Sequence, residues 1–226
     1  AARIQERLKV TSVPAPVTCR GTLACSSPVL PRYYANRAYR PSWSSNGNPV
    51  PQTEEMIRVI KTSPTHGLQP GDYHIEEIDA AIADLRNDLR RKDNVDAEKL
   101  ASLDLLLTDA FLLYASHMLS GRIDPGKYYV QWVANPRSAD LALILQDAIE
   151  GNQVEKNLKK LEPDYVGYEN LKKALANYRT IAAKGGWGTI PGGKSTSLKR
   201  GSRNALVPAL RARLMLSGDL SAGRAA

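Results

Sequence analysis

The motif with the most specific chemical meaning in this 226-residue sequence is a glycine-rich stretch near its C-terminal end. Residues 188–195 read Gly-Thr-Ile-Pro-Gly-Gly-Lys-Ser and match G-x-x-x-x-G-K-S/T, the pattern of a phosphate-binding loop. In working loops a strand precedes the motif and a helix follows it, so that backbone N–H groups converge on the phosphates. Here a helical pattern ends at Ala183, and helix breakers follow Ser195. The flanks therefore predict an accidental match and no nucleotide.

Acid–base or nucleophilic catalysis would need side chains that face one another. Asp104 and Asp109 share one helical segment, but a separation of five residues turns them about 140° apart. Ser116 and His117 are neighbours, and adjacent residues of a helix do not face each other. We therefore interpret the two aspartates as structural and expect no catalytic residue in this chain.

The two cysteines are better placed for a local disulfide than for a metal site. Cys19 and Cys25 flank Gly21, which permits a tight turn, and a small even number of cysteines in a Pro/Ser-rich segment suits an oxidising compartment. Two free thiols are the alternative. The histidines do not have the spacing of metal ligands, and no second cysteine pair is present. We expect no metal at His66, His74 and His117.

The net charge of +8 is concentrated at the two ends of the chain. Residues 1–40 carry a net charge of +6, residues 41–183 carry −5, and residues 184–226 carry +7. Two basic ends on a mildly acidic body favour contact with a polyanion or another negatively charged surface, through an attraction that salt screens. The charge does not identify that surface.

A basic cluster near a tryptophan in the C-terminal segment supplies the candidate ligand-binding residues. They are Trp187, Lys194, Lys199, Arg200, Arg203, Arg211 and Arg213. The cations could hold carboxylates, and the ring could stack on the face of a sugar. The alternative is a solvated surface, since a basic cluster indicates attraction without naming a target.

Apolar residues recur with the period of a helix through the middle of the chain, and strand patterns are nearly absent. Residues 96–119 are the most apolar segment, which predicts the central helix. No apolar run reaches the roughly 18 residues needed to cross a bilayer. The predicted fold is all-α, a compact helical bundle. Further helices are predicted from Thr53 to Ser63-Pro64, from Ile75 to Lys92, and over residues 139–151 and 168–183.

The bundle is preceded by a proline-rich region. Residues 1–52 are predicted to form an extended arm in which prolines, among them Pro31 and Pro51, break regular structure. Four aromatic residues are expected to pin the arm to the bundle by burying their rings while their polar edges stay hydrogen-bonded. They are Tyr33, Tyr34, Tyr39 and Trp43.

Several short motifs, weak alone, are specific when taken together in order and spacing over residues 30–190. They are Tyr34–Trp43, His66–His74, Leu103–Phe111, His117–Pro125, Tyr178-Arg179 and Gly185–Trp187. The series resembles the N-terminal scaffold domain of the large periplasmic L,D-transpeptidases. On this resemblance, residues 53–190 are the helical scaffold domain, and residues 191–226 are a basic linker followed by a helix similar to the first helix of a peptidoglycan-binding module.

The resemblance does not extend to the catalytic motif of that family, a Ser-His-Gly-Cys stretch in a β-rich domain, because neither cysteine has such neighbours. It implies a non-catalytic scaffold region of a cell-wall cross-linking transferase, with peptidoglycan and the missing catalytic domain as partners. It also implies a periplasmic location, although no signal or anchor is seen in this chain. The alternative function is that of a basic helical nucleic-acid-binding protein, which charge alone supports.

Overall fold

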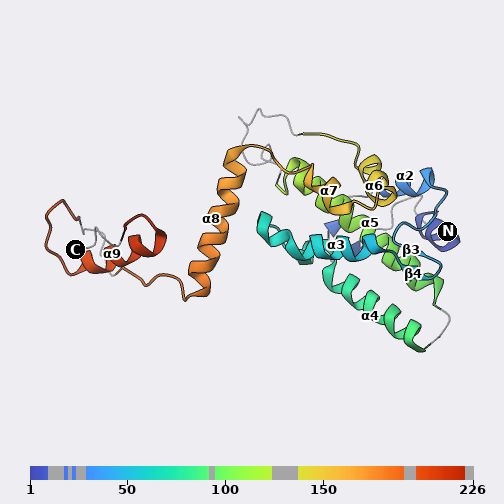
Figure 1. The fold of residues 1–226 in the computed structure, drawn as a ribbon, viewed down its shortest axis with the longest axis horizontal. Coiled ribbons are helices and arrows are strands. Elements are labelled where there is room, and N and C mark those ends of the chain that lie inside the picture. Colours follow the sequence, from blue (N-terminus) through green and yellow to red (C-terminus); the bar gives the residue numbers. More distant parts are fainter. Residues whose placement is uncertain are drawn as a thin grey trace. The chain divides into compact units, whose positions relative to one another are not determined.

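The computed structural model describes residues 1–9, 18–19, 22–23, 29–91, 95–123, 137–190 and 197–221 (Figure 1). By its internal contacts the chain forms two compact units, unit 1 (Ala1–Asp164) and unit 2 (Tyr165–Ala226). Helices make up most of the described residues of both units, which confirms the all-α class. The domain boundaries after residues 52 and 190 stay predictions. Strands occur in the described residues as two short antiparallel pairs, β1 (Thr18–Cys19) with β2 (Thr22–Leu23) and β3 (Ser44–Ser45) with β4 (Asn48–Pro49).

The helices of unit 1 pack around α5 (Ala97–Ser120), as predicted for the most apolar segment. Its Leu103, Leu107 and Phe111 are fully buried. Asp96 caps its first turn by accepting a hydrogen bond from the N–H of Glu98. The other helices are α1 (Ala2–Lys9), α2 (Val29–Asn36), α3 (Pro51–Thr62), α4 (Ile75–Arg91), α6 (Leu141–Glu150) and α7 (Val154–Lys159), with 3-10 turns η1 (Ser63–His66) and η2 (Pro70–Tyr73).

The proline-rich region is more regular than its composition predicts. Pro31 lies in the first turn of α2, and Pro51 begins α3. Both are tolerated because the first N–H groups of a helix have no partner within the helix. Between these helices, β3 and β4 form a hairpin whose turn, Asn46-Gly47, has the positive φ angles (50° and 79°) of a tight two-residue loop.

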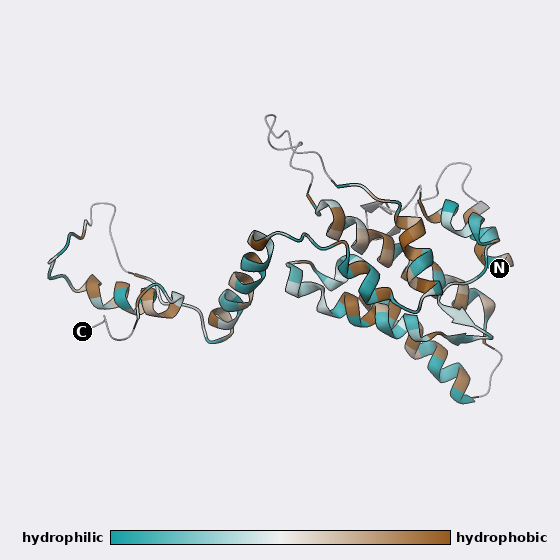
Figure 2. Ribbon diagram, turned by 45° about the horizontal axis from the view of Figure 1, so that its top comes forward, coloured by the Kyte–Doolittle hydropathy of each residue, from teal (hydrophilic) through white to brown (hydrophobic). Residues whose placement is uncertain are grey.

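Unit 2 contains α8 (Val166–Ala183) and α9 (Leu206–Ser217). The first confirms the helix predicted over residues 168–183. Of its apolar residues, Ile181 is buried, whereas Leu171 and Tyr178 are 65% and 53% exposed. In Figure 2, brown and teal segments alternate along both helices. None of the helices in the described part of the chain is both long and apolar enough to span a membrane.

Candidate functional site

The first polar site in the structure is built on Asp104, which is buried on α5. Its Oδ1 accepts a hydrogen bond from the hydroxyl of Tyr34 at 2.6 Å, and its Oδ2 accepts from the N–H of Trp43 at 2.8 Å. The N–H of Ser42 lies 3.0 Å from both oxygens. The carboxylate therefore fastens the segment between α2 and β3 to the central helix, which confirms the structural interpretation of Asp104.

Thr108, one turn further along α5, extends these contacts into a directed chain of hydrogen bonds. The hydroxyls of Tyr34 and Thr108 are 2.6 Å apart, and the indole N–H of Trp43 donates to Thr108 Oγ1 at 2.9 Å. Because the single proton of the tyrosine goes to Asp104, Thr108 must be the donor to Tyr34. We call Tyr34, Ser42, Trp43, Asp104 and Thr108 the Asp104 network.

Burial dominates the electrostatics of the Asp104 network. It raises the pKa of Asp104, although the hydrogen bonds from Tyr34, Ser42 and Trp43 act in the opposite direction. The pKa of Tyr34 is raised well above its usual value, first by burial and then by the neighbouring negative charge. The raised pKa of Tyr34 keeps its hydroxyl protonated near neutral pH, so it remains a hydrogen-bond donor to Asp104.

Arg37 orders the loop that enters the Asp104 network. Its Nε donates to the carbonyl of Arg40 at 2.8 Å, and its Nη2 donates to the carbonyl of Pro41 at 3.0 Å. Its Nη1 donates to the hydroxyl of Tyr33 at 2.9 Å, and that hydroxyl is also 2.8 Å from the hydroxyl of Ser42. The residues of the motif Tyr34–Trp43 thus hold this loop together and bind it to Asp104 on α5. As predicted, Tyr33, Tyr34 and Trp43 are buried with their polar atoms hydrogen-bonded, and Tyr39 packs against the core.

A second polar site joins η2 to the C-terminal half of α5. The Nε2 of His74 is 2.9 Å from Oδ2 of Asp109, and both side chains are buried. The hydroxyl of Tyr73 is 2.9 Å from Nδ1 of His117. We call these four residues the His74 cluster. Asp109 is thus also structural, since it fixes His74, the residue between η2 and α4, to the central helix.

His117 has the electrostatic setting of a partly buried residue. Burial is the main cause that lowers its pKa, and the charge of Arg122 lowers it further, while Asp72 opposes both. Arg122 and Asp72 form an ion pair with an N–O distance of 3.3 Å. Among the residues that the structure describes, no group of three His, Cys, Asp or Glu side chains is placed to hold a metal ion.

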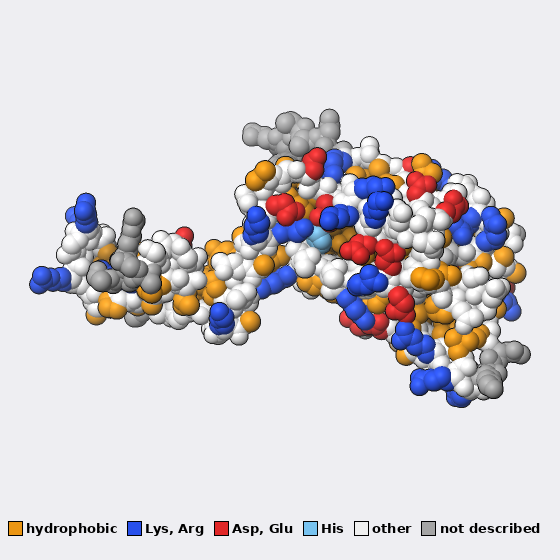
Figure 3. Space-filling view, viewed as in Figure 1, with side chains coloured by type: hydrophobic (Ala, Val, Ile, Leu, Met, Phe, Trp, Pro, Cys, Tyr) orange, Lys and Arg blue, Asp and Glu red, His pale blue; other side chains and the backbone are white. Residues whose placement is uncertain are grey.

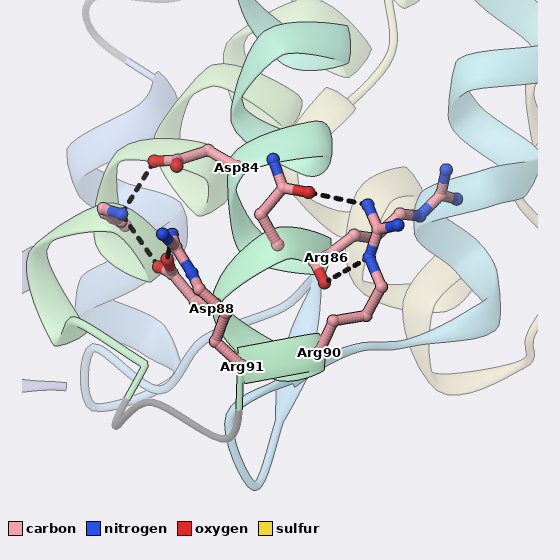
Figure 4. Close-up of polar contacts among 7 residues, drawn as sticks. Asp84, Arg86, Asp88, Arg90 and Arg91 are labelled. Carbon is pink, nitrogen blue, oxygen red and sulfur yellow. Dashed lines mark hydrogen bonds and ion pairs between the residues drawn. The ribbon is translucent and has the colours of Figure 1, made fainter.

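A third group of polar side chains ties α4 to the start of α5 (Figure 4). The Nζ of Lys99 lies between the carboxylates of Asp84 and Asp88, at 2.7 Å and 2.8 Å. Arg91 reaches Asp88 from the same helix at 3.2 Å. The hydrogen bond from Lys99 is the main cause that lowers the pKa of Asp88.

In unit 2 the structure brings together two of the predicted ligand-binding residues, Trp187 and Arg213. The guanidinium carbon of Arg213 lies 3.5 Å from the centroid of the indole ring, directly over its face. The ring of Tyr178 meets the same indole at 5.7 Å with an interplanar angle of 89°. Tyr178, which carried the resemblance but was not a predicted ligand residue, thus completes the group. We call the three side chains the Trp187 stack.

The other predicted ligand residues are dispersed. Lys199, Arg200, Arg203 and Arg211 are exposed. Lys194 and the Lys-Ser end of the glycine-rich stretch lie outside the described residues, as does the proposed partner of Cys19. The element before the glycine-rich stretch is the helix α8, as predicted.

The two units differ in surface charge. Unit 2 carries eleven Lys or Arg against two Asp or Glu, a net charge of +9, which leaves −1 for unit 1. On the face drawn in Figure 3, acidic and basic side chains intermingle over unit 1, whereas those of unit 2 are mostly basic.

Comparison with known proteins gives one match. A family model described as Scaffold domain matches residues 28–175, which is more than half of the chain. This chain belongs to the Scaffold domain family. The matched region of the scaffold domain contains the whole Asp104 network and the whole His74 cluster, and it ends within α8, before Tyr178. No curated protein and no solved structure matches the chain.

The sequence analysis did not predict which side chains form hydrogen bonds with the two buried aspartates of the scaffold domain. Tyr34 is 70 residues from Asp104, and His74 is 35 residues from Asp109. One signal was present, because a carboxylate on the most apolar helix must be buried and a buried carboxylate requires donors. That signal predicts that donors exist, but it does not say where they lie in the sequence.

Proposed function

We propose that this chain is the non-catalytic scaffold region of a bacterial peptidoglycan L,D-transpeptidase, and that it acts in the periplasm. In this proposal unit 1 holds the enzyme's cysteine-bearing catalytic domain in position, and unit 2 contacts peptidoglycan. The observation that carries the proposal is the Scaffold domain match over residues 28–175. It covers four of the six motifs that resemble the scaffolds of L,D-transpeptidases, from Tyr34–Trp43 to His117–Pro125.

The contacts of the motif residues support a holding role. Asp104, Asp109 and His74 are buried and bound to other side chains of unit 1. Polar groups used in this way fix helices relative to one another, and a rigid frame is what a catalytic domain needs if its substrates are long, stiff glycan strands.

The charge of unit 2 supports the contact with peptidoglycan. Stem peptides carry carboxylates, and a net charge of +9 on a small unit attracts them over several ångströms. The attraction of Arg200 and Arg203, both exposed, is screened by salt, so this contact should be strong only at low or moderate ionic strength.

A sedimentation assay tests the wall contact. The whole chain is mixed with purified peptidoglycan sacculi or with duplex DNA across a salt series. We expect retention on sacculi and a several-fold loss in the double variant Arg200→Gln/Arg203→Gln. The matched control, Lys156→Gln/Lys159→Gln, removes the same charge from exposed positions of unit 1 and should bind like the wild type.

Two results would overturn the wall contact. One is steep, salt-dependent retention on DNA with none on sacculi, which would favour nucleic-acid binding. The other is equal loss in both double variants, which would mean that only total charge matters. The link to a catalytic domain has a separate test in the gene: we expect the reading frame beyond Ala226 to encode a β-rich domain with a Ser-His-Gly-Cys stretch, and a stop codon there would contradict it.

A further inference from the structure

We propose that the Trp187 stack is a receptor for the carboxylate of a peptide and does not bind the face of a sugar. The inference rests on the proposed function, because it assigns to one site in unit 2 the part of peptidoglycan that this site recognises. It chooses between the two chemistries that the residue types alone leave open, charge for a carboxylate and ring stacking for a sugar.

The first step concerns the aromatic ring. A sugar stacks on an indole by covering one of its flat faces. In the Trp187 stack, a guanidinium covers one face at 3.5 Å, which is van der Waals contact, and Tyr178 meets the indole at right angles. Arg213 would have to leave its ring partner before a sugar could take that face.

The second step concerns the guanidinium. The guanidinium of Arg213 lies over the indole face, and its planar fork of N–H groups matches the two oxygens of a carboxylate. The stacking also restricts the side chain before the ligand arrives, so less conformational entropy is lost on binding. Trp187 and Tyr178 are therefore positioning residues for Arg213.

The third step concerns the anion that Arg213 lacks. Unit 2 has two acidic residues, Glu169 and Asp219. Glu169 pairs with Lys172 at 3.4 Å, and Asp219 accepts a hydrogen bond from the hydroxyl of Ser217 at 2.7 Å. Within the described part of unit 2, the contact found for the Arg213 guanidinium is the ring of Trp187. A guanidinium held in place without an acidic partner is suited to an anion supplied by a ligand.

The test uses the whole chain and three soluble probes: a stem-type peptide with free carboxylates, the same peptide with its carboxylates amidated, and an uncharged oligomer of N-acetylglucosamine. The readout is the indole N–H signal of Trp187 in NMR spectra, assigned by its loss in Trp187→Phe. We expect the free-acid peptide to shift this signal and the other two probes to leave it unchanged.

Arg213→Lys separates the planar fork from simple charge, because lysine keeps the charge but cannot bind a carboxylate with two parallel hydrogen bonds. We expect this variant to bind the free-acid peptide about tenfold more weakly, the effect of losing one charge-assisted hydrogen bond. Arg58→Lys, at an exposed position of unit 1, is the matched control and should bind like the wild type.

Three results would overturn the inference: a shift of the Trp187 signal by the sugar oligomer, equal binding of the amidated peptide, or equal effects of the two lysine variants. Its failure is distinguishable from failure of the proposed function. Sacculi that retain the wild type and Arg213→Lys equally would leave wall binding intact and remove this site from it. Sacculi that retain neither would remove the proposed wall contact itself.

Discussion

Asp104→Ala is the substitution that most directly tests the fastening of the N-terminal segment to the central helix. It removes the acceptor of three donors. The hydroxyl of Tyr34 can turn to the backbone carbonyl of residue 104, which is already 3.0 Å away. The N–H groups of Ser42 and Trp43 have no such substitute in the Asp104 network and stay buried without an acceptor.

The expected cost follows from these two donors. Each buried unsatisfied N–H costs about 2 kcal/mol, so Asp104→Ala should lower the free energy of unfolding by about 4 kcal/mol. For a chain of this length this corresponds to a fall in Tm of about 8–16 °C. Asp104→Asn should cost only about 1 kcal/mol, because its amide can donate to Tyr34 while its oxygen accepts from Trp43.

Urea unfolding followed by far-UV circular dichroism measures both values. Asp147→Ala, which truncates an exposed aspartate of α6, is the control and should change the free energy of unfolding by less than about 0.5 kcal/mol. A cost below about 1 kcal/mol for Asp104→Ala, or equal costs for alanine and asparagine, would refute the reasoning, since the network would then not depend on acceptors at this position.

The pH dependence of the asparagine variant has a definite sign. The pKa of Asp104 is raised in the folded protein, so between its usual value of 3.8 and the folded value the folded state binds more protons than the unfolded state. The contribution of Asp104 to the wild-type free energy of unfolding therefore decreases as pH rises from its usual pKa to its raised pKa in the folded protein. Asp104→Asn has no such loss, and its cost relative to the wild type should shrink as pH rises from 3 to 7.

Three further predictions concern single contacts. The lowered pKa of Asp88 implies stability that is present above its usual pKa and lost as pH falls through the folded value, so Lys99→Met should flatten the acid side of a Tm–pH curve. Ala38→Gly should stabilise the protein by about 0.5–1 kcal/mol in urea unfolding, because exposed Ala38 has a φ of 51°; a loss of stability would contradict this. Arg137 donates to the carbonyls of Met118 and Leu161 at 2.9 Å and 2.6 Å, so Arg137→Lys should cost about 1–2 kcal/mol, and a neutral result would show that the contacts are not needed.

The sequence predicts the helices better than it predicts their partners. The period of apolar residues locates α3, α4, α5, α6 and α8, because burial of one face is a local signal. The six residues of α7 are too few for that period to be seen. In α2, Pro31 argues against a helix when the sequence is considered alone. The pairing of His74 with Asp109 depends on how α4 and η2 pack on α5, which no local pattern encodes.

The same limit applies to the ligand residues. Seven were predicted from charge and proximity in the sequence, and Trp187 and Arg213 form one group in the described structure. They meet because α9 packs against α8, and this packing also brings in Tyr178 from a position nine residues before Trp187. Composition therefore points to the segment, whereas packing decides which of its side chains lie together.

The two units differ in how their charged residues affect their stability. In unit 1 the numbers of acidic and basic residues are nearly equal, which allows ion pairs such as those of Lys99 with Asp84 and Asp88. Unit 2 has too few acids to neutralise its cations, and this excess of like charge opposes compaction. Folding alone does not explain a distribution that weakens the fold. In the proposed function, binding of a polyanion replaces this repulsion with attraction, and the further inference assigns one point of that attraction to Arg213 beside Trp187.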